Sequence, residues 1–297
     1  FVKNPDASKH GRIFFRDIGD YLSRNQKLSI IRDLASIEGI RKFDGWTKIA
    51  PNKENDWVDQ RDETFAQFIP MGAKKKTEDQ PIFENFTYGV LTSRDTWCFN
   101  ASAHVLKSNI QGTINFYNAE VGRLVDADSV NDAKNSVSRD SRHISWSRAL
   151  LNDAARGKKL EFDDSNVVVA NYRPFTRQHM YFDRRLNEMV YQMYQVFPKF
   201  DVNNRAIALT AARGKAGFSS LMIDSIAEYC IASTPAGSQC FPLYLYNQQD
   251  EEPAGLFEGH SFGLQRRDAI TNAGLAHFHA AYPDEEITKE DIFYYVY

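Results

Sequence analysis

The chain has 297 residues, enough for one large or two small domains, and a formal net charge of −3. Its 42% hydrophobic and 25% charged residues exclude an intrinsically disordered protein. No apolar run approaches the ~20 residues of a membrane helix, and the residues after Phe1 are polar, so we expect neither a membrane span nor a signal peptide. Three cysteines without a CxxC pair predict a reduced, cytoplasmic protein with no zinc site, and the missing initiator Met predicts a fragment or a processed chain.

The N-terminal third alternates β-branched or aromatic runs, which favour strands, with segments of helical apolar spacing. Asp20 or Ser23 can cap the first helix, whose apolar residues recur every three residues from Leu28 to Ile37. The elements predicted here are a strand over 12–18, this helix to about residue 38, a short helix from Asn55 or Asp56 to Gln67, and strands over 86–91 and 97–99.

A helical part is expected from about residue 101 to 160. Apolar residues recur at helical spacing between Val105 and Leu124, which predicts one long helix over 103–125. The polar residues 126–142 predict a loop or a weak helix. A shorter helix is then expected over 145–156.

A β-rich part is expected from about 165 to 250, and the stretch over 167–182 dominates it. Val167 opens an apolar β-branched run typical of a buried strand. Pro174 interrupts the pattern because proline lacks the N–H that a strand ladder needs, and a second run ends at Phe182. Further segments of interest are an aromatic run with two glutamines over 189–196 and strands over 206–209 and 241–246.

Charge distinguishes this part from the rest of the chain. From Ala170 to Lys215, eight basic and three acidic residues give a local charge of +5, so the remainder carries −8 by difference from the total of −3. A basic segment in an acidic chain predicts a localised anion site. Arginine and glutamine at strand edges can bind a polyanion or base edges. A solvated strand surface with Arg–Tyr stacking is the alternative interpretation.

Two basic loops add candidate phosphate contacts. Residues 212–217 place Arg213 and Lys215 beside glycines, whose backbone N–H groups can hold a phosphate. The GxxxxGK[ST] motif is absent, so nucleotide hydrolysis finds no support. Residues 71–80 include Lys75, although an ordinary solvated loop is the simpler interpretation there.

The C-terminal region, from about residue 265 to 297, is expected to be helical. One helix is predicted over 268–282. Thr288 with Asp291 three residues later forms a capping-box pattern at the start of a last helix.

No catalytic constellation is found in the sequence. The GxSxG and HExxH motifs are absent, and so is the [DNS]PP[YFW] tetrad that methylation of an adenine amino group needs. His277 and His279 lie near two acidic residues, but alternating histidines near a helix end are more typical of surface or packing positions. We therefore expect no catalytic residue, no metal site and no bound cofactor in this chain.

Six segments together resemble the C-terminal part of the single-polypeptide Type ISP restriction–modification enzymes, often described as predicted helicases. They cover 11–28, 56–70, 93–100, 171–183, 238–246 and 287–297, in the order that the family has. The YRPF…YFD and ITKEDIFYYVY segments are the most specific. The resemblance implies that residues 1–70 are the end of a methyltransferase domain and a connector, and that 71–297 are a DNA target recognition domain, truncated in its last helix.

In that family one polypeptide carries a nuclease, an ATPase translocase, an adenine-N6 methyltransferase and a target recognition domain. The resemblance implies that this chain reads a short asymmetric DNA sequence and positions an adenine for flipping into the methyltransferase pocket. Its partners would be double-stranded DNA and the upstream methyltransferase domain, with no membrane. The parent polypeptide is expected to be an adenine-N6 methyltransferase, an ATP-dependent translocase and an endonuclease. It would need S-adenosylmethionine, ATP and Mg, whereas this fragment is expected to bind none of these three cofactors.

We therefore predict an α+β fold, with a mixed or antiparallel sheet flanked by helices and a helical N-terminal half, that recognises a DNA target. The candidate DNA-binding residues are Arg173, Arg177, Gln178, Arg184, Arg185, Arg213 and Lys215, with Lys75 and Arg94 as weaker phosphate candidates. Arg173 would equally suit a structural ion pair. A protein–protein coupling module that docks the methyltransferase and translocase without reading DNA is the alternative function. An enzyme of unknown chemistry is a third, without a converging residue set.

Overall fold

The structure is a computed structural model, which describes residue 6 and residues 11–43, 45–61, 64, 67–73, 80–124, 130–198, 202–210, 217–232, 236–248 and 264–297. The chain divides into two compact units, which we call unit 1 (Phe1–Phe68) and unit 2 (Ile69–Tyr297). The domain boundary expected after residue 70 lies beside this division. The assignment of residues 1–70 to the end of a methyltransferase domain stays a prediction.

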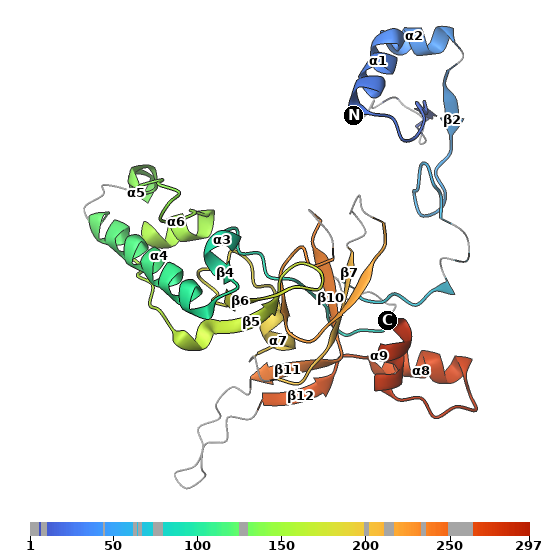
Figure 1. Cartoon of the computed structure of the whole chain (residues 1–297). Helices are drawn as coiled ribbons and strands as arrows, with labels where there is room; N and C mark the ends of the chain where they lie inside the picture. The colour runs from blue at the N-terminus through green and yellow to red at the C-terminus, as the bar shows by residue number, and fades with distance from the viewer. Residues whose placement is uncertain are drawn as a thin grey trace. The chain divides into compact units, whose positions relative to one another are not determined.

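Unit 1 consists of a two-stranded sheet with two helices inserted between its strands (Figure 1). Strands β1 (Ile13–Phe15) and β2 (Thr47–Ile49) pair antiparallel. Helices α1 (Arg24–Leu34) and α2 (Ile37–Lys42) lie between them in the chain, and α1 begins with a capping box formed by Ser23 and Gln26. Neither helix buries a residue, so the apolar face predicted for α1 is not covered by the described residues.

The short helix expected from Asn55 or Asp56 to Gln67 is not found as far as Arg61, where the continuous description of this segment ends. Asn55 and Asp59 have φ angles of 66° and 48°, a left-handed backbone that an α-helix does not admit. The Asn52 side-chain oxygen accepts the N–H groups of Glu54 and Asp56 at 3.1 and 2.8 Å, which favours a turn over a helix.

Unit 2 contains two four-stranded sheets. In the first, the order is β3 (Thr87–Tyr88), β10 (Ser238–Pro242), β7 (Ala206–Thr210) and β8 (Ser220–Ile223), all antiparallel. In the second, the order is β4 (Phe99–Asn100), β6 (Arg177–Tyr181), β5 (Val167–Asn171) and β9 (Ile226–Ala227), with β5 and β9 parallel. Only two residues separate β8 from β9, so the chain passes directly from one sheet to the other.

A third, two-stranded sheet pairs β11 (Tyr244–Gln248) with β12 (Leu264–Asp268). Residues from the two ends of unit 2 also meet beside it, because Phe83 and Ile270 form an antiparallel bridge. The Glu84 N–H donates to the Ala269 carbonyl at 2.8 Å, and the Thr271 N–H donates to the Ile82 carbonyl at the same distance. Entry and exit segments of the sheet region are thus held side by side.

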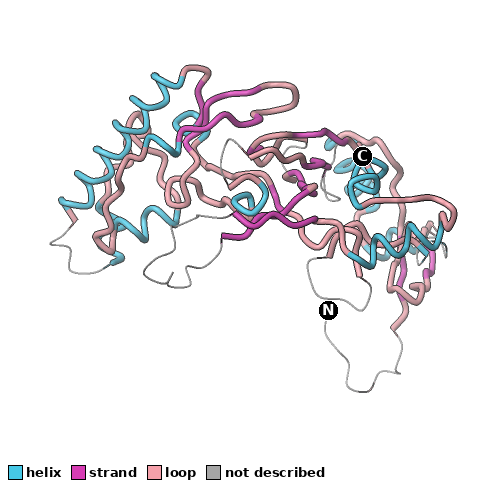
Figure 2. The backbone as a smooth tube through the Cα atoms, turned by 90° about the horizontal axis from the view of Figure 1, so that it is seen from below, coloured by secondary structure: helices cyan, strands magenta, loops and turns pink. Residues whose placement is uncertain are grey.

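The helices of unit 2 form two groups. The first comprises α3 (Asp95–Cys98), α4 (Ala103–Arg123), α5 (Val130–Ser136) and α6 (Arg148–Ala154); α4 contacts β4 and β6, and Figure 2 shows it beside these strands. Ser102 caps α4, which buries residues at helical spacing from Leu106 to Val121. The second group comprises α8 (Asn272–Ala281) and α9 (Lys289–Val296), and a short helix, α7 (Met193–Val196), contacts β11.

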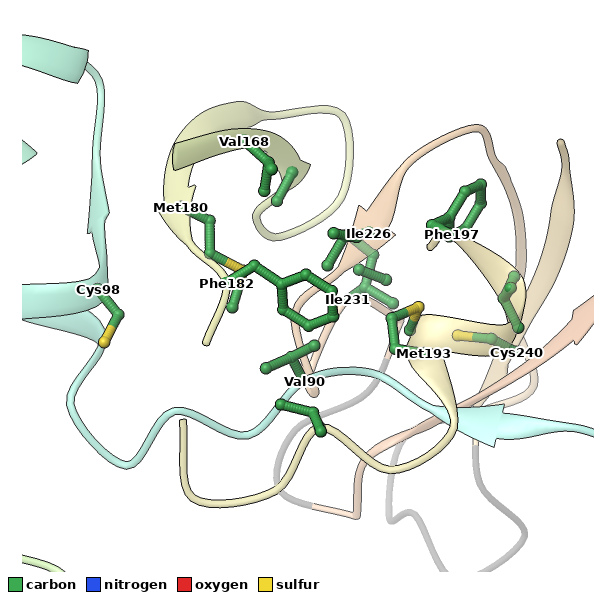
Figure 3. Packing of buried hydrophobic residues seen from close by; sticks show 14 of the residues in the cluster. Val90, Cys98, Val168, Met180, Phe182, Met193, Phe197, Ile226, Ile231 and Cys240 are labelled. Atoms are coloured by element: carbon green, nitrogen blue, oxygen red, sulfur yellow. The ribbon is translucent and has the colours of Figure 1, made fainter. Parts of the chain in front are cut away.

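One hydrophobic core joins these elements, with Tyr117, Tyr181, Phe83 and Phe293 among its largest fully buried side chains. Figure 3 shows Val168 and Met180, from the β5–β6 hairpin, beside Phe182 and near the cluster that includes Val90 and Ile226. The α+β class predicted from the sequence is confirmed. Among the described residues, no helix has the length and apolar character to cross a membrane.

Four further element assignments need correction. The helix expected to about residue 38 is interrupted at Ala35 and Ser36, between α1 and α2, and the strand expected over 241–246 is divided at Leu243 between β10 and β11.

The other two errors lie at α3 and α8. Residues 97–99 were expected to form a strand, but α3 occupies the first two of them and only Phe99 enters β4. The helix predicted over 268–282 begins at Asn272, because Asp268 still belongs to β12 and Thr271 caps the helix. Both errors concern short elements whose conformation depends on tertiary pairing rather than on local sequence.

Candidate nucleic-acid interface

The β5–β6 hairpin carries the YRPF segment at its tip. The two strands pair from Val167↔Tyr181 to Asn171↔Arg177, so residues 172–176 form the turn. The Tyr172 N–H donates to the Thr176 carbonyl at 2.8 Å. Arg173 and Phe175 both have φ angles of 62°, and the Phe175 side chain is 93% exposed.

Arg173 is held in a network of carboxylates rather than left in solvent. It forms an ion pair with Glu228, a buried residue, and another with Asp95 at 3.4 Å. Its guanidinium also lies 4.5 Å from the centre of the Tyr172 ring. The hydrogen bond to Glu228 raises the pKa of Arg173 above its usual value. These contacts favour the structural ion-pair role that was left open for this residue.

Arg177 is also paired, and Gln178 is partly buried. Both oxygens of the Asp224 carboxylate accept from Arg177 at 2.7 Å, although the two side chains stay more than half exposed. Gln178 lies on β6 opposite Ala170. An exposed ion pair of this kind contributes little to stability and can exchange for a phosphate. The DNA-binding roles predicted for Arg177 and Gln178 stay predictions.

Arg184 differs from the arginines of the hairpin. Its guanidinium lies over the Tyr194 ring at 4.1 Å, and none of the described carboxylates forms an ion pair with it. Burial raises the pKa of Tyr194 to about 12, so the ring stays neutral. Stacking on a ring pre-organises the guanidinium fork while its N–H groups stay available to an acceptor.

Arg185, the next residue, is bound to the protein instead. It donates to the Lys159 carbonyl at 2.6 Å and to the Lys158 carbonyl at 3.3 Å, and it approaches Asp153 at 3.5 Å. These contacts connect the end of the β5–β6 hairpin to the segment after α6. They favour a structural role for Arg185 over the DNA contact predicted for it.

Arg94, a weaker phosphate candidate, is 3% exposed and therefore cannot reach a phosphate in this conformation. It donates to the Leu186 carbonyl and, at 3.1 Å, to the Ser145 carbonyl, and burial lowers its pKa. We correct this assignment: Arg94 connects the helical group to the sheets. Arg213, Lys215 and Lys75 lie outside the described residues, and their predicted roles remain predictions.

A cluster of amide side chains beside α7 was missed in the sequence. The Asn85 Nδ2 group donates to the side-chain oxygen of Gln192 and, at 3.3 Å, to that of Gln195. Both glutamines are exposed. Their spacing of three residues was visible in the sequence, but Asn85 lies more than a hundred residues earlier, and only the fold brings it to them. We call Asn85, Arg184, Gln192 and Gln195 the α7 patch, because each belongs to α7, borders it or contacts a residue of it.

Side chains of the types that bind metal ions lie apart from one another in the part of the chain that the structure describes. No group of three or more His, Cys, Asp or Glu side chains there could hold a metal ion. The His279 ring nitrogen lies 2.9 Å from the Ile287 carbonyl, a contact that connects α8 to the segment before α9. The α7 patch instead offers hydrogen-bond donors and acceptors of the kind that recognise base edges and phosphates.

Solved structures with similar folds include restriction-modification enzymes in complex with DNA or a DNA mimic. One is a nuclease-deletion mutant of the Type ISP restriction-modification enzyme LlaGI in complex with a DNA substrate mimic, with a TM-score of 0.73 and 33% identity, which matches 90% of this chain and 24% of that chain. Another is the ATP-dependent Type ISP restriction-modification enzyme LlaBIII bound to DNA, with a TM-score of 0.76 and 29% identity over 100% of this chain and 18% of that one.

A DrdV–DNA complex is also similar, with a TM-score of 0.70 and 28% identity over 85% of this chain and 23% of that one. The chain thus spans a quarter or less of the length of these proteins. No curated protein matches it significantly. The family profile of the Type ISP C-terminal specificity domain matches residues 81–297. The match covers nearly all of unit 2, and the chain therefore belongs to the family of Type ISP C-terminal specificity domains.

Proposed function

We propose that this chain is the DNA target recognition domain of a restriction–modification enzyme. It reads a short DNA sequence and positions the duplex for adenine-N6 methylation, and for translocation and cleavage, by domains upstream in the same polypeptide. S-adenosylmethionine, ATP and Mg serve those upstream domains, and the methyltransferase domain is the direct protein partner of this chain. Recognition, rather than a chemical step, is its contribution.

The observation that carries this proposal is the similarity to DNA-bound enzymes. Ninety per cent of the chain aligns at 33% identity with a Type ISP enzyme in complex with a DNA substrate mimic. Two further similar structures are also DNA complexes. A specificity domain in such enzymes has to contact DNA to select a sequence.

The described side chains support the proposal in a specific way. The α7 patch combines a stacked arginine with three amide groups, and these are the residue types that read guanine and adenine edges in the major groove. Arg173 and Arg185 stabilise the scaffold that carries this patch. We therefore assign base reading to the α7 patch rather than to Arg173 and Arg185, which are bound to the protein.

A binding selection tests the proposal directly. The chain is mixed with a pool of random DNA duplexes at low and at physiological salt, binding is followed by fluorescence anisotropy, and the bound fraction is sequenced. We expect an enriched short asymmetric motif and an affinity that falls as salt rises, because phosphate contacts release counterions. Absence of binding even at low salt would contradict the proposal.

One observation favours a second function, a coupling module that docks other domains of the parent enzyme. Tyr282, Tyr295 and Tyr297 at the C-terminal helices are 45%, 69% and 51% exposed. Exposed aromatic side chains are typical of protein interfaces. Binding of the purified methyltransferase domain in the absence of any DNA binding would favour this function over DNA recognition.

A further inference from the structure

The tip of the β5–β6 hairpin presents one aromatic side chain to solvent under unusual backbone constraints. Phe175 is 93% exposed, the highest exposure of any described Phe. Its φ angle of 62° lies in the left-handed region, and so does that of Arg173, two residues earlier. Glycine or asparagine adopts this conformation at little cost, whereas Phe and Arg do not. Burial does not compensate for the cost at Phe175.

The backbone of the tip is held across the turn by the hydrogen bond from the Tyr172 N–H to the Thr176 carbonyl at 2.8 Å, and on its N-terminal side by side-chain contacts. Asn171 donates from its side chain to the Ser225 hydroxyl at 2.7 Å, and the Tyr172 ring lies 4.6 Å from the Phe99 ring. Arg173 is bound to Glu228 and Asp95, as described above. A strained backbone persists only where surrounding contacts determine it, and such sites are typical of binding surfaces. The contacts of Asn171, Tyr172 and Arg173 thus hold the residues that precede Phe175, whose own side chain stays exposed to solvent.

We propose that Phe175 is a wedge that stacks against a base pair of the bound duplex and opens a base step. An apolar side chain inserted between base steps unstacks them and kinks the duplex. This proposal rests on the DNA-recognition function proposed above. It assigns to the hairpin a role distinct from the hydrogen-bonding role of the α7 patch.

The surroundings of Phe175 favour a base over a protein surface. Its neighbours along the hairpin, Pro174 and Thr176, are exposed but small, and Arg177 next to them is charged, so these described residues of the tip form no large apolar patch with the ring. A protein interface centred on an aromatic residue would need such a patch. Arg173 is bound by two carboxylates, so only Arg177, by exchange of its exposed ion pair, can offer a guanidinium at the tip to a phosphate. Stacking, which every base can provide, is the interaction that the Phe175 ring itself offers.

A duplex with a single abasic site separates stacking from ordinary contact. The test uses the full 297-residue chain and one duplex sequence, which is either intact or carries a single abasic site at successive positions. The affinity for each duplex is compared between wild type and the variants Phe175→Ala, Phe175→Trp and Val169→Ala. Val169 lies on the same hairpin and is 44% exposed, which makes it the matched control. Thermal unfolding of each variant checks that the fold is unchanged.

We expect Phe175→Ala to weaken binding to the intact duplex by about tenfold or more, by the same factor at low and physiological salt, because stacking releases no counterions. Wild type should prefer at least one abasic duplex over the intact one, since unstacking there is already complete. Phe175→Ala should lose this preference, and Phe175→Trp and Val169→Ala should keep it.

Two outcomes would overturn the wedge while leaving DNA recognition intact. The first is equal affinity of wild type and Phe175→Ala for the intact duplex. The second is a wild type without preference for any abasic duplex. A wild-type chain that binds no duplex at all would instead refute the recognition function on which the wedge rests, so the two failures are distinguishable.

Discussion

In unit 1, Ile31 on α1 is 59% exposed and Phe43 after α2 is 76% exposed, whereas in unit 2 Tyr117 on α4 and Phe293 on α9 are fully buried. Both units nevertheless build helices with the same N-terminal devices, since α1 and α9 each begin with a capping box. Capping determines where a helix begins, and burial of an apolar face determines whether that helix contributes to global stability. Four predictions test whether this difference between the units is real.

The largest expected difference concerns apolar side chains. Phe293 packs edge-on against Phe83, with ring centres 6.3 Å apart. Phe293→Ala should lower the free energy of unfolding by about 3–5 kcal/mol, because it leaves a cavity in the core. Ile31→Ala in unit 1 should change it by about 0.5 kcal/mol or less. Urea unfolding measures both, and equal losses would show that unit 1 is packed as tightly as unit 2.

Ion pairs should differ in the same direction. Arg173→Met leaves the buried Glu228 carboxylate without its ion-pair partner and should cost about 3 kcal/mol. Arg61→Met in unit 1 removes a partner of Asp56, but that carboxylate is accessible to water, so global unfolding should hardly change. The double variant Arg173→Met/Glu228→Gln should recover part of the loss. Thermal unfolding that showed no recovery would argue against a direct interaction between these two residues.

Low pH should destabilise unit 2 because it protonates Glu120. Glu120 is 7% exposed, and its carboxylate accepts hydrogen bonds from Arg123 at 2.7 Å and from the Ser138 N–H at 2.5 Å. The hydrogen bond from Arg123 holds the pKa of Glu120 below its usual value of 4.5. A depressed pKa means that its stabilisation is complete above pH 4.5 and is lost as the pH falls through the lower folded-state value. Near neutral pH, Glu120→Gln should cost about 1.5 kcal/mol.

The difference between wild type and Glu120→Gln should therefore shrink as the pH is lowered below 4.5. Unit 1 offers the comparison, since Arg61 lowers the pKa of Asp56 to about 2. Asp56→Asn should leave the unfolding of unit 2 unchanged at every pH, because the stability linked to the Asp56 pKa belongs to unit 1. A destabilisation by Glu120→Gln that stayed constant with pH would show that the carboxylate charge is not the cause.

The smallest expected difference concerns the two capping boxes themselves. Thr288 accepts the Asp291 N–H at 3.1 Å, and Thr288→Ala should cost about 1 kcal/mol of global stability because α9 buries Ile292 and Phe293. Ser23→Ala should shorten α1 without changing global unfolding, since α1 buries nothing. Circular dichroism with chemical denaturation distinguishes a local from a global loss.

Local patterns predicted much of the fold. The β-branched run at Val167 became β5, and the helical spacing between Val105 and Leu124 became α4, because both patterns are long and regular. The two-residue strands β3, β4 and β9 could not be delimited in this way. They exist only because a partner strand from a distant segment supplies their hydrogen bonds.

The candidate site was less predictable because charge was counted along the sequence. The window from Ala170 to Lys215 has a charge of +5, but Asp224 and Glu228 lie just beyond it and pair with Arg177 and Arg173. Arg94 was a candidate phosphate contact, since sequence alone does not distinguish an arginine that binds phosphate from one that donates to carbonyls inside the protein. Asn85 and Gln192 meet only through the fold.

The bridge between Phe83 and Ile270 has a consequence for the synthesis of the protein on the ribosome. Ile82 and Glu84 are translated long before their backbone partners, Thr271 and Ala269, which lie nearly two hundred residues later. At ~5–20 residues per second, translation leaves these early groups unpaired for on the order of ten seconds or more. The emerging chain must therefore keep Phe83 and the residues beside it from aggregating until residues 269–271 have left the exit tunnel.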